Sequence, residues 1–463
     1  MTPTRKSLPV LASAFLGAAA LLGVSSAPAN ATEGYFQYGY GARSKGLAGA
    51  GVADSRDATA PATNPAGLAG ISTQINAAFT LFSPRREFTG SSALPAPFSY
   101  GFTPLGNYDS NANWHAIPNF ALAYQLDEDS SLGLMVLGNG GMNTTWPRMT
   151  RNLTNGPCPA GTTGIGVYCM GKAGVDLMQM MIGATYARRL NETFSFGITP
   201  MFALQRFRAD GLAAFGAAST DPGNLTARGY SYSYGGGVRA GVQVDLTDRI
   251  RLGLAGQTPM WMTKFDKYSG LFANDGSFDI PANITAGVAF DVTDAFRVMF
   301  DYKHIFYGSV DAISNPSTNI LTCVPGSSTC LGGKNGPGFG WDDIDVFKVG
   351  VEWDATSDLT LRAGYSYNTN PISSRDVMFN ILAPGVVQHH ITAGLEYDLD
   401  ENNSIELAAA YVPETTVTGR ELPGFGNPAH KIELAMHQFE LTVGWKYVFN
   451  PPKAMIEDPV YKP

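Results

Sequence analysis

The chain has 463 residues, a formal net charge of −8 and only 15% charged residues, so no strongly basic surface points to a nucleic-acid partner. Hydrophobic residues make up 44% and glycine contributes 53 positions, which is unusual for a soluble protein of this length. After the first 31 residues there is no run of about 18 apolar residues, which excludes membrane-spanning helices. An alternating membrane barrel hides its hydrophobicity from such scans, and the composition favours that class.

Residues 1–31 are predicted to be a secretory signal peptide. Arg5 and Lys6 precede an apolar run from Leu8 to Val24, and a small-x-small site ends at Ala31. The alternative is a membrane anchor helix. The run is short for a span of about 20 apolar residues and is interrupted by a proline and a glycine, so cleavage after Ala31 is favoured.

The next segment, residues 32–73, is predicted to be a plug. Its stretch Gly34–Gly70 is rich in glycine and alanine and has neither the period of a strand nor that of a helix. A compact segment of small residues is able to fold inside a barrel, and we expect residues 74–449 to form that barrel around it.

The rest of the chain alternates short polar turns with long loops rich in glycine, proline and asparagine. Six short turns and seven long connections join fourteen strands, and an even number returns the chain to the periplasm. The fold class predicted is therefore all-β, a 14-stranded antiparallel transmembrane β-barrel. The short turns are expected at residues 127–130, 191–193, 247–249, 293–295, 356–358 and 400–403.

The strands alternate apolar and polar residues, as in Phe439, Leu441 and Val443 against Glu440 and Thr442. Soluble sandwiches also alternate, but aromatic residues at strand ends favour a membrane interface. The aromatic residues concerned are Trp353, Tyr397, Tyr411 and Trp445. The charged residues expected to face the lumen are Arg239, Lys348, Glu352, Arg362 and Glu396.

Glycines also recur on the inward face. They allow strand curvature or leave room for the plug, and the sequence does not decide between the two. The glycines are Gly253, Gly287, Gly350, Gly364, Gly394 and Gly444.

The four cysteines form two local pairs, which predicts loop disulfides Cys158–Cys169 and Cys323–Cys330 in a secreted chain. Four cysteines allow three connectivities. Zinc is the competing interpretation, and the lack of a nearby histidine or a CxxC spacing argues against it, so no metal site is expected.

Two blocks in the plug segment, Ser44–Gly51 and Asn64-Pro65-Ala66-Gly67, resemble the N-terminal hatch of the FadL-type outer-membrane transporters of fatty acids and hydrocarbons. Further blocks extend the resemblance over nearly the whole mature chain and are most similar to the FadL and TodX-like branch. These are residues 278–283, 338–341, 361–366 and 379–385. One departure is residues 450–463, which follow the last aromatic residue and are expected to form a periplasmic extension.

The resemblance assigns a role to the third strand, Ser131–Trp146. Its glycines weaken strand pairing and predict a bulge or kink. In the family a kink in this strand opens the wall, so that an apolar ligand leaves sideways into the membrane. The resemblance implies such an exit at Asn139, Gly140 and Gly141.

Apolar residues in two long loops are the predicted ligand-capture residues, because these loops form a hydrophobic landing groove in the family. The alternative is that the loops only pack on each other. The residues are Leu212, Phe215, Tyr268, Leu271 and Phe272.

A fatty-acid carboxylate would favour a buried cation, and the candidates are Arg206, Arg208 and Lys303. Each is also explained as a charge lining the lumen. The chain has no cation in the stretch Tyr307–Asp311, which weakens the case for a fatty acid over a neutral hydrocarbon.

The function predicted is passive uptake of hydrophobic compounds, foremost long-chain fatty acids, by a monomer in the bacterial outer membrane among lipid and lipopolysaccharide. Alternatives are an aromatic or alkane hydrocarbon channel, a general porin and an adhesin. An enzyme is disfavoured because alternation sends His389 and His390 to opposite faces, with no serine nucleophile evident beside His390 and no GxSxG or HExxH pattern. No cofactor is expected.

Overall fold

The computed structural model describes residues 33–424 and 426–449. The predicted signal peptide and the predicted C-terminal extension, residues 450–463, lie outside the described residues. The described part begins with three short helices, α2 (Gly41–Gly46), η1 (Ala60–Ala62) and η2 (Pro65–Leu68), and continues into strands. The strands are β1 (Gln74–Ser92), β2 (Gly106–Asp109), β3 (His115–Gln125), β4 (Ser130–Asn143), β5 (Gly174–Arg189), β6 (Phe194–Asp210), β7 (Ser231–Thr247), β8 (Ile250–Gln257), β9 (Trp261–Met262), β10 (Asn283–Thr293), β11 (Phe296–Ile305), β12 (Ile344–Asp354), β13 (Leu359–Asn368), β14 (His389–Asp398), β15 (Asn403–Arg420) and β16 (His430–Val448).

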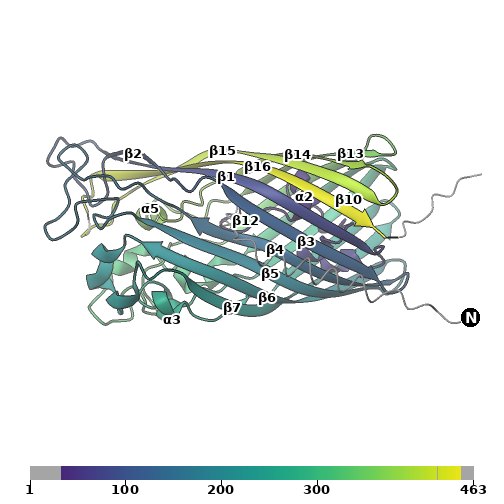
Figure 1. Ribbon diagram of the computed structural model, residues 1–463, viewed down its shortest axis with the longest axis horizontal. Coiled ribbons are helices and arrows are strands. Elements are labelled where there is room, and N and C mark those ends of the chain that lie inside the picture. Colours follow the sequence, from purple (N-terminus) through teal and green to yellow (C-terminus); the bar gives the residue numbers. More distant parts are fainter. Residues whose placement is uncertain (1–32, 425, 450–463) are drawn as a thin grey trace, which may run out of the picture.

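The strands form a closed antiparallel β-barrel (Figure 1). Each strand of the wall pairs with the next wall strand in chain order, and β1 pairs with β16 from Gln74↔Val448 to Ser92↔His430. Two short strands, β2 and β9, pair only with β1 and β7 respectively, which leaves fourteen strands in the wall. The predicted 14-stranded barrel is confirmed. Closure gives every wall strand two partners, so the wall itself has no edge strand.

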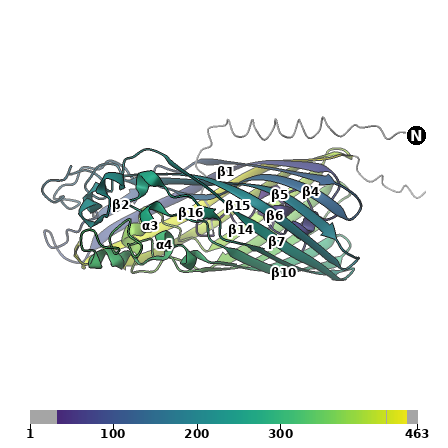
Figure 2. The same ribbon diagram turned by 90° about the horizontal axis from the view of Figure 1, so that it is seen from below.

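Short turns lie at one end of the barrel and long loops at the other (Figure 1). All six predicted turns connect neighbouring strands, for example residues 126–129 between β3 and β4. The loop end carries short helices, including α3 (Ala273–Gly276), α4 (Asp311–Ser314) and α5 (Val377–Asn380), and Figure 2 shows α3 and α4 there. Within the described part, no helix has the length and apolar character needed to cross a bilayer.

The wall strands turn apolar side chains outward and polar ones inward, as alternation predicts. Phe439, Leu441 and Val443 of β16 are about half exposed, whereas Glu440 and Thr442 between them are buried. The five charged residues predicted to face the lumen are buried, and the four aromatic residues predicted at strand ends are exposed. The outer surface therefore has the apolar character of a bilayer-facing wall.

Residues 33–73, called the N-terminal segment below, lie inside the barrel. Helix α2 contacts β13, β14, β15, β16 and β1, while η2 contacts β5, β6 and β7 on the other side of the wall. The inward glycines make this fit possible: a Cβ at Gly364 would collide with Leu47, and one at Gly394 would lie 3.0 Å from the Cα of Gly46. Gly253, Gly287, Gly350 and Gly444 also face atoms of the segment. Of the two explanations for these glycines, the structure favours room for the segment.

Candidate functional site

Buried ion pairs hold the N-terminal segment to the wall. The guanidinium of Arg43 donates to both carboxylate oxygens of Glu352 on β12, at 2.9 and 3.2 Å. The same group donates to Asp54 of the segment at 3.0 Å, and Lys45 pairs with Glu440 on β16 at 2.5 Å. Buried charges are stable only when paired, so these contacts fix one position of the segment in the lumen.

A second charged cluster holds the start of the segment. The carboxylate of Glu33 lies 2.7 Å from the ammonium groups of both Lys303 and Lys348. Lys348 also donates to the carbonyl of Tyr38 at 2.7 Å. Tyr307 completes the cluster, because its hydroxyl donates to the carbonyl of Glu33 at 2.7 Å and accepts from the amide of Tyr35 at 3.0 Å. The first described residues are thus fixed to β11, β12 and the loop after β11.

The predicted hatch motif forms a capped turn. Asn64 is fully buried, and its side-chain oxygen accepts from the amide of Ala66 at 3.0 Å, which caps helix η2. Its amide group donates to the carbonyl of Val52 at 2.7 Å and to that of Val242 on β7 at 3.0 Å. Pro65 begins the helix, and Gly67 lies so close to Ser55 that a Cβ would not fit. One side chain therefore joins two parts of the segment to the wall.

Replacing Asn64 with alanine is expected to lower the free energy of releasing the segment from the wall by about 2–4 kcal/mol. The helix cap and two hydrogen bonds are lost, and two carbonyls stay buried without their donor. Hydrogen exchange of residues 64–70 measures this as faster exchange. Asn64→Ser retains a cap hydroxyl but no amide donors, so an intermediate rate is expected. Parent-like exchange in Asn64→Ala would show that the motif does not hold the segment.

Strand β4 contains a bulge where the sequence predicts a kink. Its register with β5 shifts between Gly138 and Gly140, which leaves Asn139 as the extra residue. The N-terminal segment pairs with this bulge: Phe36 bridges Gly140, the amide of Gly141 donates to Tyr35 at 3.2 Å, and the amide of Gln37 donates to Asn139 at 3.1 Å. Backbone groups released by the bulge are thus satisfied by the segment rather than by the neighbouring strand.

The side chain of Asn139 points into the barrel and is fully buried. It accepts from the hydroxyl of Tyr40 at 3.0 Å and donates to Gln179 of β5 at 2.9 Å. The bulge residue is therefore bonded both to the segment and to the wall, so a movement of the segment removes bonds from the bulge.

An apolar cavity lies among the long loops, and we call it the outer cavity. Its volume is about 50 Å³, below the ~300–1,000 Å³ of ligand pockets in general, so a ligand enters only if side chains move. Its wall is contributed by five long loops and the neighbouring strands. The lining residues include Tyr168, Phe207, Leu212, Phe215, Leu271, Phe272, Phe339, Phe379 and Leu382.

Four of the predicted capture residues are buried in this loop cluster, and the fifth, Leu271, is half-buried. Leu212, Phe215, Leu271 and Phe272 line the outer cavity. Tyr268 is fully buried but does not line it; its ring packs on Phe207 and its hydroxyl donates to the carbonyl of Gly229. The apolar loops cover one another in this structure, and the role of these residues in ligand capture stays a prediction.

Tyr168 is the main polar group of the outer cavity. Its hydroxyl donates to the carbonyl of Met378 at 2.9 Å, and burial raises the pKa of this phenol well above its usual range. The phenol therefore stays neutral, and the cavity surface it offers is apolar.

The three predicted carboxylate partners all have acidic neighbours. Lys303 pairs with Glu33, Arg208 lies 3.3 Å from Asp210, and Arg206 lies 3.9 Å from Asp176. Both arginines also lie over the ring of Tyr230. The structure does not bring these three cations together, and it places a further buried arginine, Arg86, that the sequence prediction did not single out.

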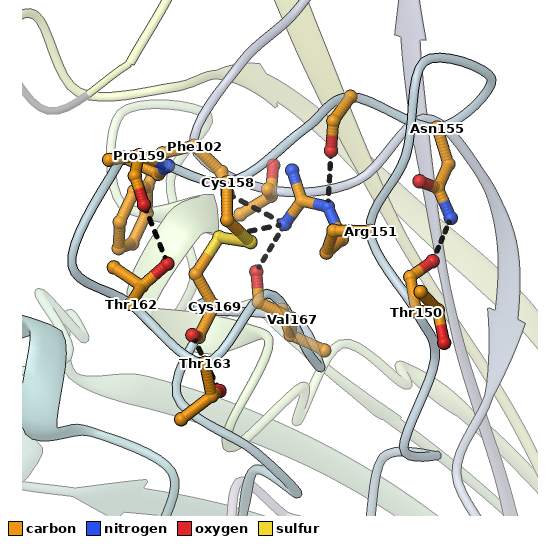
Figure 3. Close-up of a disulfide and its surroundings, with 12 residues drawn as sticks. Phe102, Thr150, Arg151, Asn155, Cys158, Pro159, Thr162, Thr163, Val167 and Cys169 are labelled. Carbon is orange, nitrogen blue, oxygen red and sulfur yellow. Dashed lines mark hydrogen bonds between the residues drawn. A yellow bond between two sulfur atoms is a disulfide. The ribbon is translucent and has the colours of Figure 1, made fainter.

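The structure joins Cys158 to Cys169 and Cys323 to Cys330, the pairs that the sequence predicts. Arg151 lies beside the first disulfide (Figure 3) and donates to the carbonyls of Gly156 and Val167 at 2.7 and 3.1 Å. Burial lowers the pKa of this guanidinium to about 10. The arginine and the disulfide together order the loop between β4 and β5.

His390 faces inward, as predicted, but a serine does lie beside it. Ser366 Oγ is 3.2 Å from His390 Nδ1, a neighbour across β13 and β14 that the linear sequence does not reveal. His390 Nε2 has no hydrogen-bond partner among the described residues, so no third group orients the ring as in a catalytic triad. Residues 33–424 and 426–449 contain no cluster of three or more histidine, cysteine or acidic residues able to hold a metal.

The sequence matches the family described as outer membrane protein transport protein (OMPP1/FadL/TodX) over residues 23–427. No curated protein matches the chain. The fold is similar to that of the Pseudomonas putida toluene transporter TodX, with a TM-score of 0.62, 18% identity and coverage of 89% of this chain and 99% of that one.

Two further solved structures share the fold. A Pseudomonas aeruginosa FadL homologue gives a TM-score of 0.63 at 16% identity, and the match covers 90% of this chain and 100% of the homologue. The Ralstonia pickettii toluene transporter TbuX gives a TM-score of 0.58 at 15% identity, and the match covers 89% of this chain and 99% of TbuX. At these identities the likeness concerns the fold.

Proposed function

Since this chain belongs to the outer membrane protein transport protein family (OMPP1/FadL/TodX), we propose that it takes up long-chain fatty acids or related hydrophobic compounds passively and releases them sideways into the membrane. The observation that carries the proposal is the backbone pairing of the N-terminal segment with the β4 bulge. An apolar solute loses little when it moves from an apolar cavity into lipid, but a water-filled pore would expose it to water.

The route begins at the loops. A hydrophobic compound enters the outer cavity by displacing the packed side chains of Phe215, Phe272 and Phe379. The compound then moves inward past the loop stretch around Leu382, a residue that lines this cavity. Movement of the N-terminal segment, our proposed hatch, frees Gly140 and Gly141, and the compound leaves through the wall at the bulge.

An aromatic hydrocarbon is the second candidate substrate. Two of the similar folds are named as toluene transporters, and the outer cavity is lined by several aromatic rings that suit an aromatic ligand. A neutral hydrocarbon requires no cation, and the three cations first considered all have acidic neighbours.

The proposal is tested by uptake of radiolabelled oleate and toluene in a Gram-negative host that lacks its own transporters for them. Cells with the parent protein are expected to take up at least one compound faster than cells with an empty vector. Liposomes containing the purified protein are expected not to swell with small sugars, since the N-terminal segment fills the lumen. Sugar-driven swelling without uptake of either compound would instead indicate a diffusion porin.

A further inference from the structure

Arg86 is a buried cation without a carboxylate partner. It lies on β1, opposite Met436 of β16, and its exposed fraction is 5%. Its Nη1 donates to the carbonyl of Ala112 at 3.1 Å, and no described acidic residue forms an ion pair with it. An uncompensated charge in a protein interior is costly, so such a residue needs an explanation.

The other buried arginines are compensated. Arg43, Arg297 and Arg362 each bind carboxylates. Arg151 and Arg239 form no ion pair with a carboxylate of the described residues, but each donates to several oxygen atoms of the chain. Among the buried arginines of the described residues, Arg86 is the one with a single acceptor. Most of its guanidinium donors are therefore available to an external anion.

Arg86 also lines a cavity beside the bulge, which we call the inner cavity. Its volume is about 20 Å³, and it is bounded by Gly34 of the N-terminal segment and Gly141 of β4. Trp341 and Ala383 supply apolar surface to its lining. Ala383 follows directly after Leu382, which lines the outer cavity, so one short stretch of chain separates the two cavities.

We propose that Arg86 binds the carboxylate of an amphiphilic ligand whose apolar chain occupies the space toward the outer cavity. The inference rests on the proposed uptake function and names its substrate class: long-chain monocarboxylates. A guanidinium binds a carboxylate through two parallel hydrogen bonds, and a neutral hydrocarbon would leave the charge uncompensated. When the N-terminal segment moves away at Gly34, the bound head group lies next to Gly141 and the bulge.

The test compares oleate with oleyl alcohol, which has the same chain but no carboxylate, on the detergent-purified full barrel. The parent is expected to bind oleate about 10-fold more tightly or better, since hydrogen bonds between charged groups are the stronger class. Arg86→Gln is expected to lose this preference while its affinity for the alcohol stays within about twofold. Arg85→Gln is the matched control, because Arg85 lies next along β1 with its guanidinium over the ring of Trp114.

Equal binding of oleate and the alcohol by the parent would overturn the inference without any variant, so it remains testable even if Arg86→Gln fails to fold. An unchanged preference in folded Arg86→Gln would overturn it too. In both cases the proposed uptake function would stand if the compounds are still transported. Failure to bind or transport oleate, the alcohol or toluene would instead refute the uptake function, and the role of Arg86 with it.

Discussion

Replacing Glu352 with glutamine is expected to lower the free energy of releasing the N-terminal segment from the barrel wall by about 3–5 kcal/mol, the cost of removing one partner from a buried ion pair. The carboxylate of Glu352 is 3% exposed and accepts hydrogen bonds from Arg43, Arg297 and Arg362. Arg43 belongs to the segment, whereas the other two arginines belong to the wall. The substitution therefore removes a carboxylate charge that compensates all three buried arginines.

Hydrogen exchange of residues 41–46 measures this effect, and we expect exchange in Glu352→Gln to be roughly 10²–10³-fold faster, because each 1.4 kcal/mol is about tenfold. Swelling of liposomes with small sugars should rise as the lumen opens. Glu433→Gln is the control, since Glu433 is exposed and accepts only from Thr418 at 3.0 Å. Parent-like exchange in Glu352→Gln would mean that other contacts hold the segment.

The barrel itself was predictable from the sequence because its signals are local. Alternation with a period of two and short turns recur along the chain, so strand number and turn positions follow without long-range contacts. The bulge at Gly138–Gly141 was also predictable, since glycines weaken strand pairing where they stand. The partner of the bulge was not, because Phe36 is about a hundred residues away in the sequence.

The candidate site was predictable only in part. The sequence shows that glycines such as Gly364 face inward. It does not show that Leu47 lies against Gly364, because this contact depends on how the N-terminal segment folds. Arg85 and Arg86 are adjacent on one strand, so alternation places one of them inside. The surroundings of Arg86 were not predictable, because the cavity it lines is completed by the stretch around Ala383, nearly three hundred residues later.

The burial of the loop residues could not be predicted for a similar reason. Phe215 lies in the loop after β6, yet its ring contacts Tyr168 and Phe379 from two other loops. An apolar residue in a loop is consistent with either a ligand surface or a packed cluster, and only the relative positions of several loops decide.

In the proposed mechanism, ligand leaves through the β4 bulge when the N-terminal segment moves. A disulfide between Phe36→Cys and Gly140→Cys would prevent that movement. The two residues form an antiparallel bridge, and directly opposite residues in such a pair lie about 4.5–5.5 Å apart between Cα atoms, within the range of a disulfide. The four native cysteines are already joined in two disulfides. Uptake is expected to fall to the level of the empty vector when this disulfide forms.

The most direct measurement is the initial rate of oleate uptake by cells carrying this double variant, before and after mild reduction. Release through the bulge predicts vector-level uptake in the oxidised protein and recovery on reduction to the rate of the two single-cysteine variants. Parent protein given the same reductant corrects for any effect on the loop disulfides. Uptake at the single-variant rate in a fully oxidised double variant would contradict release through the bulge.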